Sequence, residues 1–134
     1  MAKDAPAPRR SRWRTRLGLG VVALVCLVGA GFAVYVWGAL HFAYSDGHRS
    51  GYVQKFSRKG WICKTWEGEL VMATQPAVVP EIFRFTVRDE AVAARINENM
   101  GERVSLRYEQ HLGLPSRCFG DTDYFVTDVS RVKP

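Results

Sequence analysis

Two carboxylates, Glu67 and Glu69, lie two positions apart in a segment rich in aromatic and β-branched residues. On a strand, residues two apart point to the same face, so both carboxylates are predicted to lie side by side. Paired carboxylates can act as an acid and a base, but pairing across strands with Lys64 and Arg84 is the simpler interpretation. No serine or cysteine sits in a recognisable nucleophile motif, so we predict no enzymatic activity and no catalytic residue.

Four residues near the C-terminal end are of types that bind metals: His111, Cys118, Asp121 and Asp123. Their spacing does not follow the short paired intervals that zinc sites use. The two aspartates are better explained as loop residues that cap the turn before the last strand, because aspartate side chains bond to nearby backbone N–H groups. We therefore predict no metal site and no resident cofactor.

His48 and Tyr52 have a His-x-x-x-Tyr spacing that resembles the haem-handling motif of the membrane-anchored OB-fold haem chaperones of cytochrome c maturation. In that family the motif follows the barrel, whereas here it precedes the segment predicted to fold into one. An exposed linker histidine is the simpler interpretation. A small haem- or metal-handling protein, or a small enzyme, is kept as the alternative function.

Residues 18–23 spell GLGVVA, which fits the G-x-G-x-x-A pattern of dinucleotide-binding proteins. That pattern binds a cofactor where it follows a strand and opens a helix in a β-α-β unit. Here it lies inside an apolar run, and small residues are common in membrane helices, so dehydrogenase activity is disfavoured. Gly29 and Ala33 have the spacing of a small-xxx-small contact, which would allow a homodimer through this helix.

The apolar run covers residues 17–40 and contains no charged side chain. A helix of this length spans about 36 Å, enough to cross a hydrocarbon core of about 30 Å. Aromatic residues lie just before the run, at Trp13, and near its far end, at Tyr35, Trp37 and Tyr44, as is typical of the two membrane interfaces. A cleaved signal peptide is the alternative, but its apolar region usually covers only about 7–15 residues. We predict an uncleaved signal-anchor that makes the lipid bilayer a partner of the chain.

Basic residues gather in the tail of residues 1–16, which holds six of them against one acidic residue. Positive charge beside a membrane span stays in the cytoplasm, so we predict a cytoplasmic tail and a periplasmic C-terminal domain on the inner membrane. The remaining thirteen basic and twelve acidic residues leave that domain nearly neutral. Because nucleic-acid binders concentrate positive charge on their folded part, we predict no nucleic-acid partner.

The three cysteines divide between the two parts of the chain. Cys26 lies within the apolar run, whereas Cys63 and Cys118 lie in the outer domain, where an oxidising compartment permits disulfides. A bridge between Cys63 and Cys118 would close a loop of about 55 residues and stabilise the domain by about 3–4 kcal/mol on the chain-entropy model. Two separate buried thiols are the alternative.

The outer domain is predicted at residues 51–134, after a linker at 41–50. Runs of aromatic and β-branched residues, several with apolar residues at every second position, predict strands. Turn residues separate these runs, as with the glycine at the end of residues 57–60 and the prolines of residues 75–80. The expected strands are five: 51–56, 61–73, 82–88, 103–111 and 124–132.

A short amphipathic helix is predicted between the third and fourth strands. Asp89 is a good N-cap residue, Val92, Ile96 and Met100 form an apolar stripe, and Gly101 is placed as a C-terminal cap. The order is therefore β-β-β-α-β-β, which is the order of an OB-like barrel. An open α+β meander with the helix on one face is the alternative fold.

Several stretches of the outer domain resemble the sequence motifs of a known family. They are KFSRKGW at 55–61, KTWEGEL at 64–70, YEQH at 108–111 and CFGDTDYFV at 118–126. With these stretches the chain resembles a family of short bacterial single-pass membrane proteins of unknown function. Some of its members carry dehydrogenase-like names, but the resemblance implies no catalytic residue and no mechanism.

In an OB-like barrel, the loop after the first strand and the loop between the fourth and fifth strands lie at one mouth. We predict an interaction module that contacts an envelope protein, peptide or glycan through this mouth or through the side of the strand near Trp66. Trp61 and Trp66 have opposite strand parity, so a regular strand would expose one of them. The expected contact residues are charged or aromatic: Arg58, Lys59, Trp61, Trp66, Arg117 and Asp121.

Overall fold

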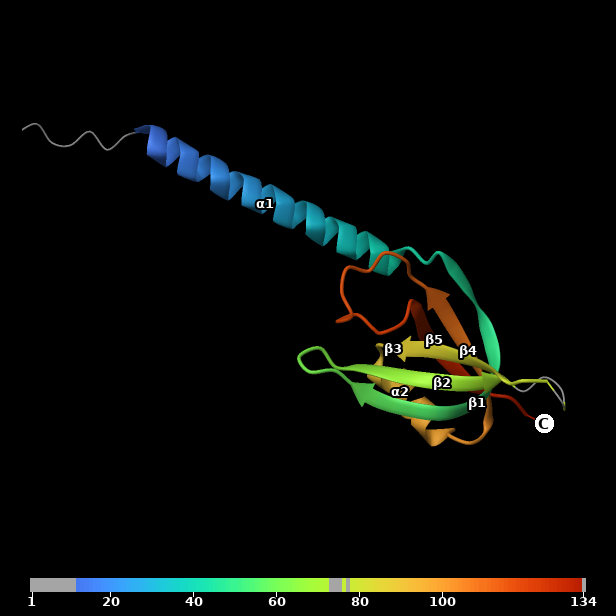
Figure 1. Ribbon diagram of the computed structural model, residues 1–134. Helices are drawn as coiled ribbons and strands as arrows, with labels where there is room; N and C mark the ends of the chain where they lie inside the picture. Colours follow the sequence, from blue (N-terminus) through green and yellow to red (C-terminus); the bar gives the residue numbers. More distant parts are fainter. Residues whose placement is uncertain (1–11, 73–75, 77, 134) are drawn as a thin grey trace, which may run out of the picture. The chain divides into compact units, whose positions relative to one another are not determined.

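The computed structural model describes residues 12–72, 76 and 78–133. The chain divides into two compact units, with the boundary in the sequence between Trp37 and Gly38. The first unit holds most of one long helix, and the second holds five strands and a short helix (Figure 1). Most of the predicted basic tail at 1–16, and part of the predicted loop at 75–80, lie outside the described residues.

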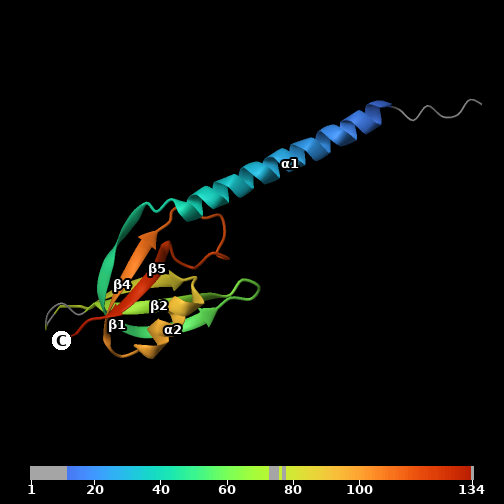
Figure 2. The same ribbon diagram turned by 180° about the vertical axis from the view of Figure 1, so that it is seen from behind.

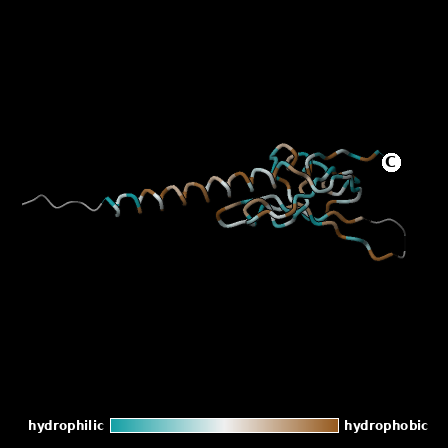
Figure 3. Tube along the Cα trace, turned by 90° about the horizontal axis from the view of Figure 1, so that it is seen from above, coloured by the Kyte–Doolittle hydropathy of each residue, from teal (hydrophilic) through white to brown (hydrophobic). Residues whose placement is uncertain are grey.

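Helix α1 covers Arg12–His41, and none of its residues is buried. Residues 17–40 carry no charge, and a helix bonds the backbone polar groups of such an apolar run internally except at its ends. Apolar colour follows the helix beyond its polar first residues (Figure 3). Its length and a mean hydropathy of 2.5 over the most apolar stretch are those of a helix able to cross a membrane.

The five strands close into a barrel in the order β1-β2-β3-β5-β4 (Figure 1). The strands are β1 Ser45–Lys59, β2 Thr65–Met72, β3 Glu81–Val87, β4 Arg103–Gln110 and β5 Tyr124–Arg131. Neighbouring strands are antiparallel except β3 and β5, which run parallel and pair at Thr86 and Phe125. The predicted order of elements is therefore confirmed, and the closed ring excludes the open meander.

Strand β1 is longer than the sequence predicted. Its first half pairs with β4 from Ser45, and its second half pairs with β2 as far as Lys59. Most of the segment predicted as a linker at 41–50 is thus sheet, because pairing with β4 overrides the weak strand propensity of its glycine and polar residues. In contrast, β2 begins only at Thr65, so Trp61 lies in the loop between β1 and β2.

The barrel encloses a core of aliphatic and aromatic side chains from every strand, including Leu70, Phe85 and Leu106. Helix α2, Glu90–Glu98, packs against β3 and β5 and adds Val92 and Ile96 to this core (Figure 2). Asp89 caps it as predicted, since its Oδ1 accepts a hydrogen bond from the Ala91 N–H at 2.8 Å. The helix ends earlier than expected, at Glu98, so Met100 lies beyond it and is partly exposed.

Candidate functional site

The outward side of β1, β2 and β3 carries three rows of side chains that cross the strands, and we call this surface the strand face. The strand registers place the members of each row directly opposite one another. The first row is apolar, the second is charged and the third is polar: Tyr52–Val71–Ile82, Lys55–Glu69–Arg84 and Ser57–Glu67–Thr86. The strand face therefore offers an aromatic ring and both signs of charge, whereas Glu67 and Thr86 of the third row are buried.

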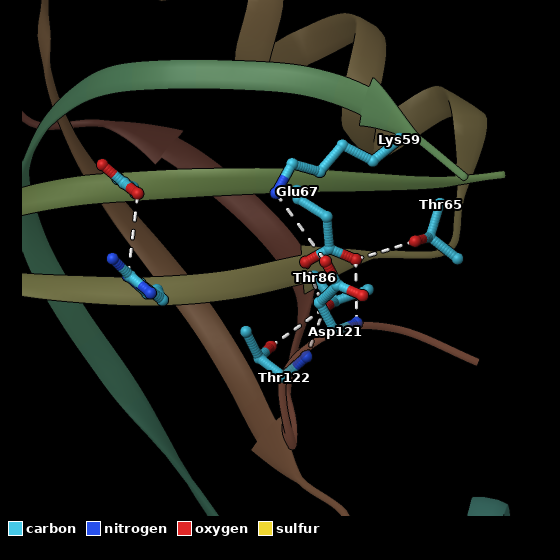
Figure 4. Close-up of polar contacts among 8 residues, drawn as sticks. Lys59, Thr65, Glu67, Thr86, Asp121 and Thr122 are labelled. Carbon is cyan, nitrogen blue, oxygen red and sulfur yellow. Dashed lines mark hydrogen bonds and ion pairs between the residues drawn. The ribbon is translucent and has the colours of Figure 1, made fainter. Parts of the chain in front are cut away.

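A groove of about 230 Å³ runs between the strand face and the end of the β4–β5 loop. The residues that line it are mostly charged or hydroxylated: Lys55, Ser57, Lys59, Glu67, Gly68, Glu69, Arg84, Asp121 and Thr122. Two ion pairs lie among these residues. Arg84 Nε lies 3.6 Å from Glu69 Oε1 on the neighbouring strand. Lys59 Nζ lies 3.7 Å from Asp121 Oδ2 of the β4–β5 loop (Figure 4). No ion pair of Lys55 is found among the described residues.

Glu67 forms the floor of this groove and is buried, with 8 % of its surface exposed. Its Oε1 accepts hydrogen bonds from the Thr65 hydroxyl at 2.7 Å and the Asp121 N–H at 3.0 Å. Its Oε2 accepts from the Thr86 hydroxyl at 2.8 Å (Figure 4). A buried carboxylate is tolerated when donors surround it, so these three bonds fix Glu67 and hold the β4–β5 loop on β2 and β3.

The same loop needs a glycine where it meets the strand face. Gly120 has a φ of +154°, and a Cβ atom there would lie 2.5 Å from the Thr86 Cγ2 atom. The next residues bond to the same threonine, since the Thr122 N–H donates to Thr86 Oγ1 at 3.3 Å. The close approach of this backbone to Thr86 gives the groove its second wall.

A disulfide between Cys63 and Cys118 joins the β1–β2 loop, residues 60–64, to the β4–β5 loop, residues 111–123. The predicted bridge is therefore confirmed. The two loops project from one side of the barrel in both views (Figures 1 and 2). Four of the predicted contact residues line a hollow of about 360 Å³ around the bridge: Lys59, Trp61, Arg117 and Asp121.

The other two predicted contact residues, Arg58 and Trp66, lie apart from that hollow and face α2. Trp66 stacks on Phe56 with ring centroids 5.1 Å apart, and its Nε1–H donates to Glu90 Oε2 at 3.0 Å. Arg58 pairs with the same glutamate at 3.8 Å. Trp61, in contrast, is fully exposed, so the tryptophan left to solvent is the one in the loop.

The sequence gives no signal for Arg49, because it lies in the predicted linker at 41–50, which becomes a strand only by pairing with β4. It lies on β1 with its guanidinium 4.8 Å above the Phe83 ring and 3.2 Å from Glu81 Oε1. Burial alone would lower the pKa of Arg49, but hydrogen bonds with Tyr108 and Glu81 raise it above its ordinary value. Arg49 thus contributes a fixed positive charge to a second cleft, of about 470 Å³, beside the groove.

Two of the residues considered as metal ligands, His111 and Cys118, have other partners. Cys118 is in the disulfide, and the two ring nitrogens of His111 lie 2.9 Å from Ala39 O and 3.3 Å from Glu109 Oε2. His48 and Tyr52 lie on β1, about 13 Å apart along the strand, too far to share one ligand atom. Within the described part of the chain, no three His, Cys, Asp or Glu side chains gather as a metal site.

Comparisons with known proteins identify the domain and its fold. Residues 43–134 match the family described as "Domain of unknown function (DUF8785)". No curated protein matches the chain. A solved structure of the mitochondrial single-stranded DNA binding protein Rim1 from S. cerevisiae is similar, with a TM-score of 0.52 and 11 % identity over 69 % of this chain and 97 % of that one. A second structure of Rim1 gives a TM-score of 0.48 and 15 % identity over 69 % and 98 %.

The likeness to Rim1 corrects one prediction from the sequence, that the chain has no nucleic-acid partner. The fold is shared with a protein described as a single-stranded DNA binding protein, so this class of ligand is not excluded. The exclusion rested on the near-neutral charge of the whole domain. That charge is a sum over the domain and does not describe the surface that a ligand meets, so it cannot exclude a class of ligand.

Proposed function

The chain belongs to the DUF8785 family of domains of unknown function, and we propose that it is a membrane-anchored OB-like module that binds a polypeptide on its strand face. The observation that carries this proposal is the charged row Lys55–Glu69–Arg84, which borders the groove and is open to solvent beside Tyr52. OB-like barrels commonly bind extended ligands on this face, between the β1–β2 and β4–β5 loops.

The mixed charge of the groove favours a polypeptide as the ligand. Three basic and three acidic side chains line it, and a peptide can present groups of either sign together with backbone donors and acceptors. Tyr52 adds a ring that is 40 % exposed, and Ile82 beside it is 56 % exposed. An exposed aromatic ring next to a polar groove is typical of the anchor residues of protein interfaces.

The proposed location of the module is a membrane, and the properties of α1 support this proposal. The helix is long and apolar enough to cross a bilayer, and basic side chains precede the apolar run. Under the positive-inside rule, the N-terminus is cytoplasmic and the barrel faces the periplasm of the inner membrane. A disulfide in the barrel fits an oxidising compartment of this kind.

A photocrosslinking pair tests the binding surface. The full chain is expressed with p-benzoylphenylalanine in place of Tyr52 on the strand face, or in place of the exposed Arg107 on β4 as the matched control. The proposal expects a discrete protein adduct from position 52 and none of that mass from position 107. Equal adducts from both positions, or none from position 52, would remove the strand face as the binding surface.

A labelling experiment tests the topology separately. A membrane-impermeant maleimide is added to intact cells, with and without a reductant, and a Cys26→Ser background removes the free thiol of α1. Labelling of Cys63 and Cys118 only after reduction is the expected result. Labelling that requires cell lysis would place the barrel in the cytoplasm and reject the proposed anchor orientation.

Single-stranded nucleic acid is the second candidate ligand, and the likeness to Rim1 is the observation that favours it. Tyr52 could stack on a base, while Lys55 and Arg84 could contact phosphates. The test is a fluorescence anisotropy titration of a labelled oligonucleotide with the full chain in lipid nanodiscs, at low and at physiological salt. Saturable binding that weakens with salt, and that Tyr52→Ala reduces, would establish this ligand. Binding unaffected by Tyr52→Ala would not use the strand face.

A further inference from the structure

The β1–β2 loop presents two large apolar side chains to solvent, and we call them the loop tip. Trp61 is 100 % exposed and Ile62 is 97 % exposed. Single exposed apolar residues are common on protein surfaces, but adjacent tryptophan and isoleucine side chains without any cover form a protruding apolar point. The strand face does not use these residues, so the loop tip needs another explanation.

The loop tip is fixed to the domain. The next residue, Cys63, is bonded to Cys118 of the β4–β5 loop. On the other side, Gly60 has a φ of +130°, and a Cβ atom there would lie only 1.8 Å from the Cys63 carbonyl oxygen. The turn is therefore tight and closed at both ends. A surface group held in this way loses little conformational entropy when it binds.

The β4–β5 loop, which the disulfide joins to the loop tip, is also bonded near its start to the last turn of α1, and the strand end before it is bonded to a residue that follows the helix. At the start of the loop, the His111 ring bonds to the Ala39 carbonyl oxygen at 2.9 Å. Just before it, the Gln110 carbonyl oxygen accepts a hydrogen bond from the Tyr44 N–H at 2.7 Å. All of these residues belong to the unit of residues 38–134. The β4–β5 loop thus connects the loop tip with the point where the domain would leave the membrane.

The chemistry of the loop tip and its surroundings fits a lipid surface. Tryptophan rings prefer the boundary between headgroups and acyl chains, and aliphatic side chains insert beside them. Lys64 follows Cys63 at the end of the loop tip, and Arg117 precedes Cys118 on the other side of the disulfide. Both side chains are exposed. Basic residues around an apolar point attract the anionic lipids of a bilayer.

From these contacts we propose that Trp61 and Ile62 dock into the interface of the same bilayer that holds α1. The proposal rests on the membrane anchor proposed above. Docking gives the barrel a second attachment besides the helix, and it restricts the rotation of the domain about its tether. The strand face would then be presented to its partner in a defined orientation above the lipid surface.

Fluorescence quenching of single-tryptophan variants tests this proposal in the full chain. Each variant keeps one of three tryptophans and has phenylalanine at every other tryptophan position, so Trp37, Trp61 or Trp66 remains. The protein is placed in nanodiscs of zwitterionic and anionic lipids, with brominated acyl chains as the quencher. Trp66 is the matched negative control, because it packs on Phe56 and bonds to Glu90.

The proposal expects strong quenching of Trp37 and Trp61 by the brominated lipids, weak quenching of Trp66, and a blue-shifted emission of Trp61. Quenched Trp37 with solvent-like, unquenched Trp61 would overturn the docking and leave the anchor intact. If Trp37 itself were unquenched, the anchor would fail, and with it the docking proposal. The three variants therefore separate the two failures.

A measurement on the wild-type sequence covers the case in which a substituted variant does not fold. The chain is labelled with 5-fluorotryptophan, and the ¹⁹F resonances are compared in nanodiscs with and without a spin-labelled lipid. Broadening of the Trp61 resonance, together with that of Trp37 but not of Trp66, is the expected result. A sharp Trp61 resonance that a water-soluble relaxation agent broadens would overturn the proposal.

Discussion

Replacing Glu67 by alanine should destabilise the barrel far more than replacing Glu69, although the two lie on the same strand and face. The Glu67 carboxylate accepts three hydrogen bonds, and the Thr86 side chain that donates one of them is fully buried. Hydrogen bonds to a charged group contribute about 1.5–3 kcal/mol each, and a buried donor left without a partner costs about 1–3 kcal/mol.

These contributions do not add fully, because two of the three donors can form hydrogen bonds with other acceptors. The Thr65 hydroxyl can turn to water, and Thr86 lies 2.8 Å from the Thr122 hydroxyl, which can replace one lost partner. The Asp121 N–H has no such replacement among the hydrogen bonds of the described residues. We therefore expect a loss of about 3–4 kcal/mol for Glu67→Ala.

Glu69→Ala is the matched control. Glu69 pairs with Arg84 at 3.6 Å, but the Arg84 side chain is 75 % exposed, so solvent screens the pair. Such exposed pairs contribute about 0–1 kcal/mol. The gap between the two variants should thus be about 3 kcal/mol, which lowers the urea midpoint of Glu67→Ala by about 1.5 M if the slope is about 2 kcal/mol per M.

Urea unfolding of the full chain in a non-ionic detergent, followed by near-ultraviolet circular dichroism, measures both variants. A Thr86→Val change in each background completes a double-mutant cycle, and a coupling of about 1–2 kcal/mol with Glu67 is expected. If the free energies of unfolding of Glu67→Ala and Glu69→Ala differed by less than about 0.5 kcal/mol, Glu67 would not anchor the loop. A preformed groove wall would then be refuted.

Three further changes test other parts of the structure. Cys63→Ser with Cys118→Ser opens a loop with a sequence separation of 55 and should lower the free energy of unfolding by about 4 kcal/mol, which thermal unfolding of oxidised and reduced wild type would check. Gly120→Ala places a Cβ atom against Thr86 at a φ of +154° and should cost about 1–3 kcal/mol, seen as a lower urea midpoint. A hydrogen bond from the following backbone N–H lowers the pKa of Asp128 from its usual 3.8, so its stabilising effect is present above about pH 4 and is lost as the pH falls further. Asp128→Asn should therefore flatten the acid loss of stability, measured by urea unfolding at a series of pH values.

The closed barrel could be predicted because its signals are local. Alternating apolar residues marked most strands, and Asp89 with Val92 and Ile96 marked the helix between the third and fourth strands. The disulfide followed from this order, since it places the loops that carry Cys63 and Cys118 at one mouth.

The start of β1 and the role of Glu67 could not be read from the sequence, because both depend on distant partners. Residues 45–50 become a strand only by pairing with β4, and their glycine and polar side chains give no strand pattern. Glu67 is buried by the backbone of residues 120–122, which lie far along the chain. The position of Glu67, two residues before Glu69 on one strand, does not indicate that a distant loop buries it.

The same dependence explains the placement of the two tryptophans. Parity along one long strand predicted that either Trp61 or Trp66 would be exposed, but it could not identify which. The strand begins at Thr65, so Trp61 falls in the loop, while Trp66 is covered by Phe56 and bonded to Glu90 of α2.

The central claim is that the charged row of the strand face recognises a partner, and crosslinking from position 52 in a charge-swapped background tests it most directly. Glu69→Arg with Arg84→Glu keeps the pair between β2 and β3 but reverses the charges that a ligand meets. We predict that the adduct from position 52 disappears in this double variant while its urea midpoint stays close to that of wild type. An adduct of unchanged yield in a folded, charge-swapped protein would contradict the claim.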